Sequence, residues 1–221
     1  MKTGQKCSIV IFLLALVVLE PFTAFVAPAA KADVKKIMKD VKKTLDSLET
    51  FSCSFKRVLV RKKPDRTTNI TGTIMMKKPY KIRVNYKNRI FITDGKTTWY
   101  YLAKNNQVQI STFEYNEATY PSPHSIFKRY SIDREAVWIG SENVNGVQCD
   151  IVNLESKDPE EPQVTVWIDR TLHFPVKTLE EFPSGEVTSH MLDDIKINKK
   201  IDDNIFTFVP NNDVTIIDLR E

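Results

Sequence analysis

The sequence is poor in the residues from which catalytic sites are usually built. It has six glycines, three cysteines and three histidines in 221 residues, and it contains no G-x-S-x-G, H-E-x-x-H or C-x-x-C motif and no glycine-rich phosphate loop. His124, His173 and His190 are too scattered to suggest a metal site. Adjacent acidic residues such as Asp202-Asp203 would point to opposite faces of a strand, which does not imply a pair of cooperating carboxylates. The sequence therefore gives no reason to expect an enzyme, a metal or a cofactor.

A strong charge of one sign is also missing. The formal net charge of the whole chain is +4, and removing residues 1–32, which carry three lysines and one glutamate, lowers it to +2. A chain so close to neutral is not typical of proteins that bind nucleic acid. We therefore expect no nucleic-acid partner.

The longest hydrophobic run lies near the N-terminus and is short for a membrane span. Two lysines precede the apolar stretch 8–19, and small residues ending in Ala-Lys-Ala at 30–32 follow it. A retained membrane anchor would need about 20 apolar residues, whereas this pattern is typical of a cleaved signal peptide. We expect residues 1–32 to be removed on export to the periplasm, which leaves a single domain of residues 33–221 that begins at Asp33.

The three cysteines leave one question open. Cys7 precedes the apolar stretch, so it cannot be the lipid-modified cysteine of a lipoprotein signal. Cys53 and Cys149 remain in a compartment where disulfides are allowed. Each lies in an alternating strand pattern that suits a buried thiol equally well. The sequence is compatible with a disulfide and with two free thiols.

Residues 33–50 have the spacing of an amphipathic helix. Apolar residues recur at intervals of three and four, Asp33 is a good N-cap, and lysines occupy the opposite side. Such a helix either packs on a sheet with its lysines in water or lies on an anionic membrane surface. The pattern favours packing on a sheet.

Most of the remaining chain alternates as strands do. About eleven short apolar segments follow one another, separated by turn residues such as Asp94-Gly95. The segment Pro123–Tyr130 interrupts them and predicts a short helix capped by Ser122, which could cover the strands. This order predicts a mainly β fold with helices, of the α+β class, built on a large curved antiparallel sheet or barrel.

The strands carry more apolar side chains than expected for a sheet with one face exposed to solvent. Ile74 and Met76 share a face of one strand, and the stretch Trp99–Leu102 is apolar on both faces. The surplus either fills a solid core under the helices or lines a concavity that holds a ligand.

Three motifs resemble those of the periplasmic outer-membrane lipoprotein carriers of the LolA type. The first two, "GTIMMKKPYKIRVNY" at 72–86 and "FITDGKTTWYYLAKNNQV" at 91–108, have the family's order of glycine, apolar strand, basic-proline turn, aromatic-rich strand and D-G-K-T-x-W hairpin. The third, "NIFTFVPNNDVTIIDL" at 204–219, is similar to its closing strand. The resemblance implies an unclosed antiparallel β-barrel with an N-terminal helix and a mid-chain lid helix over a hydrophobic cavity for acyl chains.

The resemblance also implies roles for individual residues. Ile126 and Phe127 would lie on the lid. Lys78 stands where studied carriers have an arginine that holds the empty cavity closed, and lysine lacks the planar fork of that side chain. The latch candidates are therefore Lys78 and Arg83, or the closed state is weaker in this protein. The cavity would be lined by Ile74, Met76, Ile82, Val84, Tyr86, Ile92, Trp99 and Tyr101.

The function implied by the resemblance is carriage of lipoproteins from the inner to the outer membrane. The implied partners are acylated lipoproteins, an ATP-driven releasing complex in the inner membrane and an acceptor lipoprotein in the outer membrane, and the carrier itself would be a monomer. The alternative is a periplasmic sensor or regulatory module that detects lipids or lipoproteins with the same fold. A structural β-domain with a filled core is a further possibility.

Overall fold

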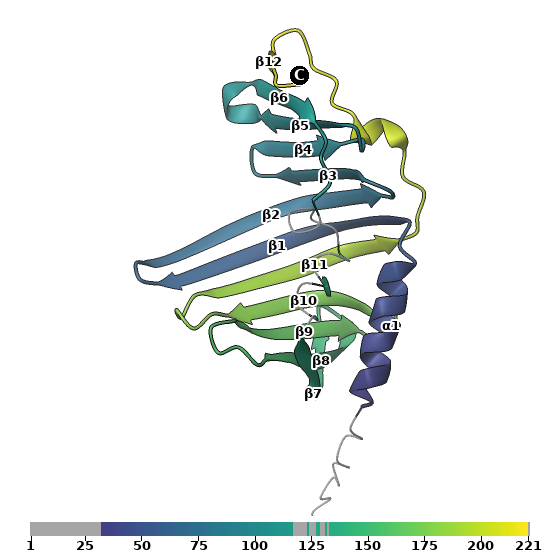
Figure 1. Ribbon diagram of the computed structural model, residues 1–221, viewed down its shortest axis with the longest axis vertical. Helices are drawn as coiled ribbons and strands as arrows, with labels where there is room; N and C mark the ends of the chain where they lie inside the picture. Colours follow the sequence, from purple (N-terminus) through teal and green to yellow (C-terminus); the bar gives the residue numbers. More distant parts are fainter. Residues whose placement is uncertain (1–31, 117–122, 124–126, 129–130, 132, 221) are drawn as a thin grey trace, which may run out of the picture. The chain divides into compact units, whose positions relative to one another are not determined.

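The computed structural model describes residues 32–220 except for 117–122, 124–126, 129–130 and 132 (Figure 1). The expected signal peptide lies outside the described residues. The described residues belong to one compact unit, Lys31–Glu221.

The described part of the chain is mainly β, as the sequence predicted, and forms one twelve-stranded sheet. Its order is β12-β6-β5-β4-β3-β2-β1-β11-β10-β9-β8-β7, and every neighbouring pair is antiparallel except β12 with β6. The outermost strands β12 and β7 do not pair with each other, so the sheet is not closed into a barrel (Figure 1). The strands are β1 (Thr50–Lys62), β2 (Asp65–Lys77), β3 (Lys81–Tyr86), β4 (Arg89–Thr93), β5 (Thr97–Leu102), β6 (Gln107–Thr112), β7 (Arg134–Val144), β8 (Val147–Ser156), β9 (Gln163–Asp169), β10 (Phe174–Glu181), β11 (Val187–Ile197) and β12 (Thr215–Asp218).

The helix α1 (Val34–Asp46) confirms the helical pattern at the start of the domain. Asp33 caps it by accepting hydrogen bonds from the backbone N–H groups of Lys35 and Lys36. Val41 and Leu45 are buried, and α1 contacts β7 and β10. The lysines of the opposite side are exposed, as expected of a helix packed on a sheet.

The helix ends earlier than its apolar pattern does. Leu48 is buried but lies beyond the last helical residue, Asp46. The side-chain amide of Asn198 accepts from the backbone N–H groups of Glu49 and Thr50 and donates to the carbonyl of Ser47. These bonds hold the chain in the extended form that begins β1, so tertiary contacts override the helical spacing.

The two faces of the sheet are covered by different parts of the chain. Phe51 and Cys53 define what we call the pocket face, which packs under α1 with a core that includes Leu45 and Val166. The opposite face of β3–β6 is covered by the segment that includes the short 3-10 helix η2 (Asp203–Phe206), whose Phe206 is fully buried. Figure 1 shows this C-terminal stretch running from β11 past β3 and β4 to β12.

Three local predictions need correction or fall outside the description. The strand β7 follows the proline-rich stretch, and its sequence does not alternate clearly enough to predict a strand. The tail "IFTFVP" was expected to be a strand, but its first two residues belong to η2. Only a few residues of the predicted cover helix, among them Pro123 and Phe127, are described.

Both remaining cysteines are free and buried, so they are not joined in a disulfide.

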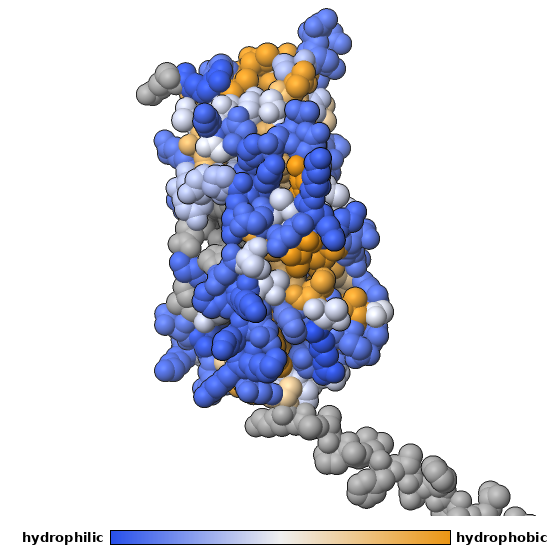
Figure 2. Space-filling model, turned by 90° about the vertical axis from the view of Figure 1, so that its right-hand side faces the viewer, coloured by the Kyte–Doolittle hydropathy of each residue, from blue (hydrophilic) through white to orange (hydrophobic). Residues whose placement is uncertain are grey.

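Another short 3-10 helix, η1 (Ala103–Asn105), links β5 to β6. Among the described helices, none has the length and apolar character needed to cross a bilayer. Figure 2 shows that the side carrying α1 is largely hydrophilic, with hydrophobic patches at the end where β12 lies and near the middle of this face.

Candidate functional site

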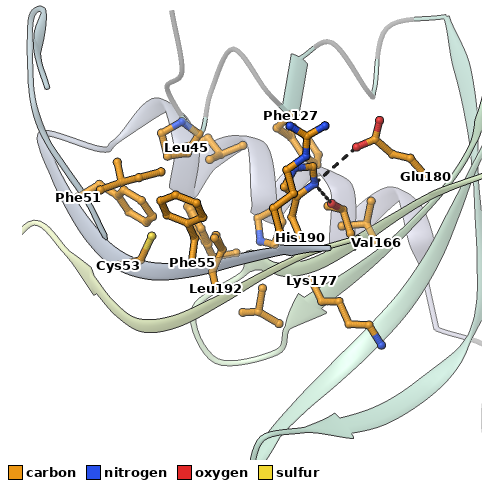
Figure 3. Close-up of a pocket in the computed structure, with 17 residues that line it drawn as sticks. Leu45, Phe51, Cys53, Phe55, Phe127, Val166, Lys177, Glu180, His190 and Leu192 are labelled. Atoms are coloured by element: carbon orange, nitrogen blue, oxygen red, sulfur yellow. Dashed lines mark hydrogen bonds and ion pairs between the residues drawn. The ribbon is translucent and has the colours of Figure 1, made fainter. Parts of the chain in front are cut away.

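A pocket of about 400 Å³ opens on the pocket face of the sheet (Figure 3). It lies between the strands β1, β2 and β9–β11 on one side and residues of α1 and the mid-chain segment on the other. Its volume falls within the ~300–1,000 Å³ usual for small-molecule sites. The lining residues are Leu45, Phe51, Cys53, Phe55, Arg57, Ile74, Pro123, Phe127, Val166, Phe174, Pro175, Val176, Lys177, Thr178, Glu180, His190 and Leu192.

Most of the pocket wall is apolar because alternate residues of β1 point into it. Phe51 stacks on Phe174 with ring centroids 5.2 Å apart. Phe55 lies opposite Gly72 in the register of β1 with β2 and opposite Leu192 in the register of β1 with β11. Packed rings and branched side chains of this kind exclude water from a cavity wall.

Polar side chains lie further along the same face of β1. Arg57 is opposite His190 on β11, which is opposite Thr178 on β10. The Nδ1 of His190 is 3.3 Å from Oγ1 of Thr178 and 3.5 Å from Oε1 of Glu180. The side chain of Lys177 points away from the cavity in Figure 3, and its Nζ lies 3.9 Å from the ring centroid of Trp167.

Five of the eight expected cavity residues share the pocket face, but only Ile74 lines the pocket. Met76 and Ile82 are buried in the core beside α1, and Val84 packs against that core. Tyr86 is on the same face, with its hydroxyl 3.4 Å from that of Tyr100.

The register corrects the other three assignments. Ile82 pairs with Thr93, and Val84 pairs with Phe91, so Ile92 points to the opposite face. Ile92 pairs in turn with Trp99, which places Trp99 and Tyr101 on that face as well. These three residues therefore cannot line one cavity with Ile74.

The C-terminal segment explains why β5 is apolar on both faces. The ring of Tyr101 packs on Phe208 with centroids 5.1 Å apart, and its hydroxyl donates to Oδ1 of Asn106. Phe206 is fully buried in η2, which contacts β3 on the same sheet. The second apolar face of β5 is thus covered by the protein's own C-terminal segment.

The two latch candidates have different surroundings. The Nζ of Lys78 donates to the backbone carbonyl of Asp46, the last residue of α1, at 3.0 Å and lies 3.4 Å from Oε1 of Glu49. Arg83 is on the opposite face and donates to the carbonyl of Ile205 at 3.0 Å. Lys78 is therefore the candidate that touches the helix, while Arg83 fastens the C-terminal segment.

The lid assignments are described in part. Phe127 lines the pocket and packs against its core, whereas Ile126 lies outside the described residues.

The pocket residues that the sequence does not predict come mainly from β1, β10 and β11. The alternating residues Phe51, Cys53, Phe55 and Arg57 indicate that one face of β1 is special. Their partners His190 and Leu192 lie more than 130 residues away in the sequence and are brought there by the pairing of β1 with β11.

The described residues of the pocket include neither a metal site nor a reactive thiol. No group of three or more His, Cys, Asp or Glu side chains among them could hold a metal ion. Burial raises the pKa of Cys53, the one thiol in the pocket wall, to about 12, so it is a poor nucleophile.

Comparison with known proteins places this arrangement in context. The family described as "Outer membrane lipoprotein carrier protein LolA" matches residues 46–209. "Uncharacterized protein MJ0687" of Methanocaldococcus jannaschii is 26% identical over 153 residues, which are 65% of this chain and 44% of that protein. The chain thus spans less than half the length of that curated relative.

Solved structures share the fold at low sequence identity. An uncharacterized conserved protein from Thermus thermophilus has a TM-score of 0.54 at 12% identity, with 83% of this chain and 98% of that chain covered. The MucA/MucB complex of Pseudomonas aeruginosa gives a TM-score of 0.47 at 13% identity, with 80% of this chain and 62% of that chain covered. The Thermus thermophilus structure supports the large unclosed sheet.

Proposed function

The chain belongs to the outer membrane lipoprotein carrier family LolA, and from that membership we propose that it is a periplasmic carrier of acylated lipoproteins. It would hold acyl chains in the pocket and move them from the inner to the outer membrane. Membership of the family supports lipid or lipoprotein binding. Transport of the lipoprotein between the two membranes is the further step that we propose.

One observation supports the proposal above the others, namely the apolar pocket between the sheet and α1. Nine of its lining side chains, Leu45, Phe51, Phe55, Ile74, Phe127, Val166, Phe174, Val176 and Leu192, are large and hydrophobic. Each methylene that leaves water contributes about 0.8 kcal/mol, so a wall of this kind suits an alkyl chain.

The volume suggests how much chain the pocket receives in this form. A volume of about 400 Å³ lies near the lower end of the ~300–1,000 Å³ usual for small-molecule sites. Such a volume is small for three acyl chains. A triacylated cargo would therefore require the wall to widen, and α1 and Phe127 are the parts of the wall that do not belong to the sheet.

A carrier must also release what it binds. The chain has no glycine-rich phosphate loop, so the energy for loading would come from an ATP-driven releasing complex in the inner membrane. Unloading would follow from tighter binding by an outer-membrane acceptor. The contact of Lys78 with the end of α1 is where we propose that opening is controlled.

The test is extraction and transfer of a triacylated lipoprotein. Inner-membrane vesicles with the host's releasing complex and ATP are incubated with the protein, and soluble cargo is measured before and after addition of outer-membrane vesicles. We expect ATP-dependent extraction and transfer, and loss of both in Leu192→Glu, which puts a charge in the pocket wall. Val209→Glu is the control, since Val209 is 83% exposed. Uptake without transfer would contradict the shuttle, and no uptake would contradict the proposal altogether.

A further inference from the structure

The pocket is graded from apolar to polar along β1. Phe51, Cys53 and Phe55 lead to Arg57 on the same face, two residues further along the strand. Beside Arg57, the register brings His190 and Thr178 into a row across three neighbouring strands. An occupant that fills the pocket would have an apolar body and a polar end.

Arg57 is the unusual member of this row. Its Nε is shut off from solvent and has no hydrogen-bond partner among the described residues. The carboxylate of Glu180, which also lines the pocket, lies 3.5 Å from Nδ1 of His190. The Nε of Arg57 thus lies in the pocket wall without a hydrogen-bond partner among the described residues.

Arg61 shows what an arginine on the same face of β1 does outside the pocket. It is exposed, and its Nε donates to Oε2 of Glu186 at 2.7 Å. The contrast matters because an enclosed donor without a partner is costly, and a positive charge more so. A guanidinium recovers that cost best by forked hydrogen bonds to a carboxylate or a phosphate.

We propose that Arg57 is the headgroup anchor of the pocket, and that the preferred occupant is an acyl chain ending in an anionic oxygen group, a carboxylate or a phosphate. The inference rests on the acyl-binding part of the proposed function, because it assigns an anionic headgroup to a chain bound at the apolar end. The ester- and amide-linked chains of a lipoprotein carry no such group at the carbonyl, so they would bind there without this anchor. The chain lies along Phe51, Phe55 and Leu192, and the anionic group accepts hydrogen bonds from Arg57.

The experiment compares ligands of equal chain length. Palmitate, hexadecyl phosphate, hexadecanol and hexadecyltrimethylammonium displace the uncharged fluorescent dye N-phenyl-1-naphthylamine from the full protein below their micelle concentrations. Inorganic phosphate and acetate test whether an anion binds without a chain. The variants are Arg57→Gln and Arg57→Lys, with Arg61→Gln as the matched control and thermal melting to verify folding.

We expect palmitate and hexadecyl phosphate to bind more tightly than hexadecanol, and the ammonium compound to bind least. Charge-assisted hydrogen bonds predict that Arg57→Gln weakens the two anions by about tenfold to a hundredfold and leaves hexadecanol unchanged. Arg57→Lys should retain part of the preference, and Arg61→Gln all of it.

The outcomes separate this inference from the proposed function. Equal binding of all four chain compounds, unaffected by Arg57→Gln, would overturn the headgroup anchor and leave an apolar carrier pocket intact. Failure of every chain compound to displace the dye would overturn the proposed function itself. Displacement by inorganic phosphate or acetate alone would also overturn the inference, because it would show an anion site that does not need the acyl chain.

Discussion

Gly72 lies directly beneath the ring of Phe55 in the register of β2 with β1. A Cβ at Gly72 would come within 2.7 Å of Cε1 of that ring and within 2.2 Å of the carbonyl oxygen of Asn85. The absence of a side chain at residue 72 therefore lets Phe55 lie against the sheet and form part of the pocket wall. The glycine that opens the family-like motif has a packing role at the proposed site.

Replacing Gly72 tests this role. Gly72→Ala should destabilise the fold by about 1–3 kcal/mol, the usual cost of overpacking, and weaken displacement of the dye by palmitate as Phe55 moves. Urea unfolding and dye displacement measure the two effects. Thr71→Ala, at the exposed neighbouring position, should change neither. An alanine variant with normal stability and binding would show that the strands tolerate a side chain there.

Removing the Lys78 side chain should loosen the contact between the β2–β3 turn and α1. Lys78→Ala loses the hydrogen bond to the Asp46 carbonyl and the ion pair with Glu49, and exposed contacts of this kind are worth about 0–1 kcal/mol. We expect dye uptake in stopped flow to accelerate by a few-fold, with little change in melting temperature. Lys42→Ala, which removes an ion pair with the Asp46 side chain instead, is the control. Equal uptake rates for both variants and the parent would show that Lys78 does not act as a latch.

The C-terminal segment should stabilise the fold without contributing to binding. Phe208→Ala removes the ring that packs on Tyr101, and a partly buried aromatic contributes about 1–3 kcal/mol. The melting temperature should fall while the dissociation constant for palmitate stays the same. A large loss of affinity in a folded Phe208→Ala protein would mean that the opposite face takes part in binding after all.

The two thiols should react only after unfolding. Burial raises the pKa of Cys53 to about 12 and that of Cys149 to about 11, so the reactive thiolate is scarce at pH 8 in the folded protein. Without reductant, a thiol-reactive dye should label neither cysteine under native conditions at pH 8 and both in urea. The native rate should rise with pH, since the thiolate fraction grows as pH approaches the raised pKa. An absence of labelling in urea would instead show a disulfide.

Local patterns were enough to predict much of the fold. The apolar spacing and the cap at Asp33 identify α1, and strict alternation identifies most strands because a sheet with one buried face repeats every two residues. The pattern also showed correctly that Ile74 and Met76 share a face. It could not show which face of each strand carries the cavity.

The site depends on relationships that no local pattern contains. Arg57 lies opposite His190 only because β1 pairs with β11. The strands β2–β10 lie between these two strands in the sequence. Trp99 and Tyr101 were assigned to the cavity because an apolar strand surface does not reveal what covers it. Tyr101 packs on Phe208, which lies about 100 residues further along the sequence.

Native mass spectrometry of the protein isolated from the periplasm of its own host tests the central claim most directly. The account predicts a co-purifying acylated species, a lipoprotein or an anionic lipid, whose mass adduct is lost in Leu192→Glu and retained in Val209→Glu. A protein that carries no adduct, and gains none when incubated with a lipidated peptide or palmitate, would contradict the claim that this pocket holds an acyl chain.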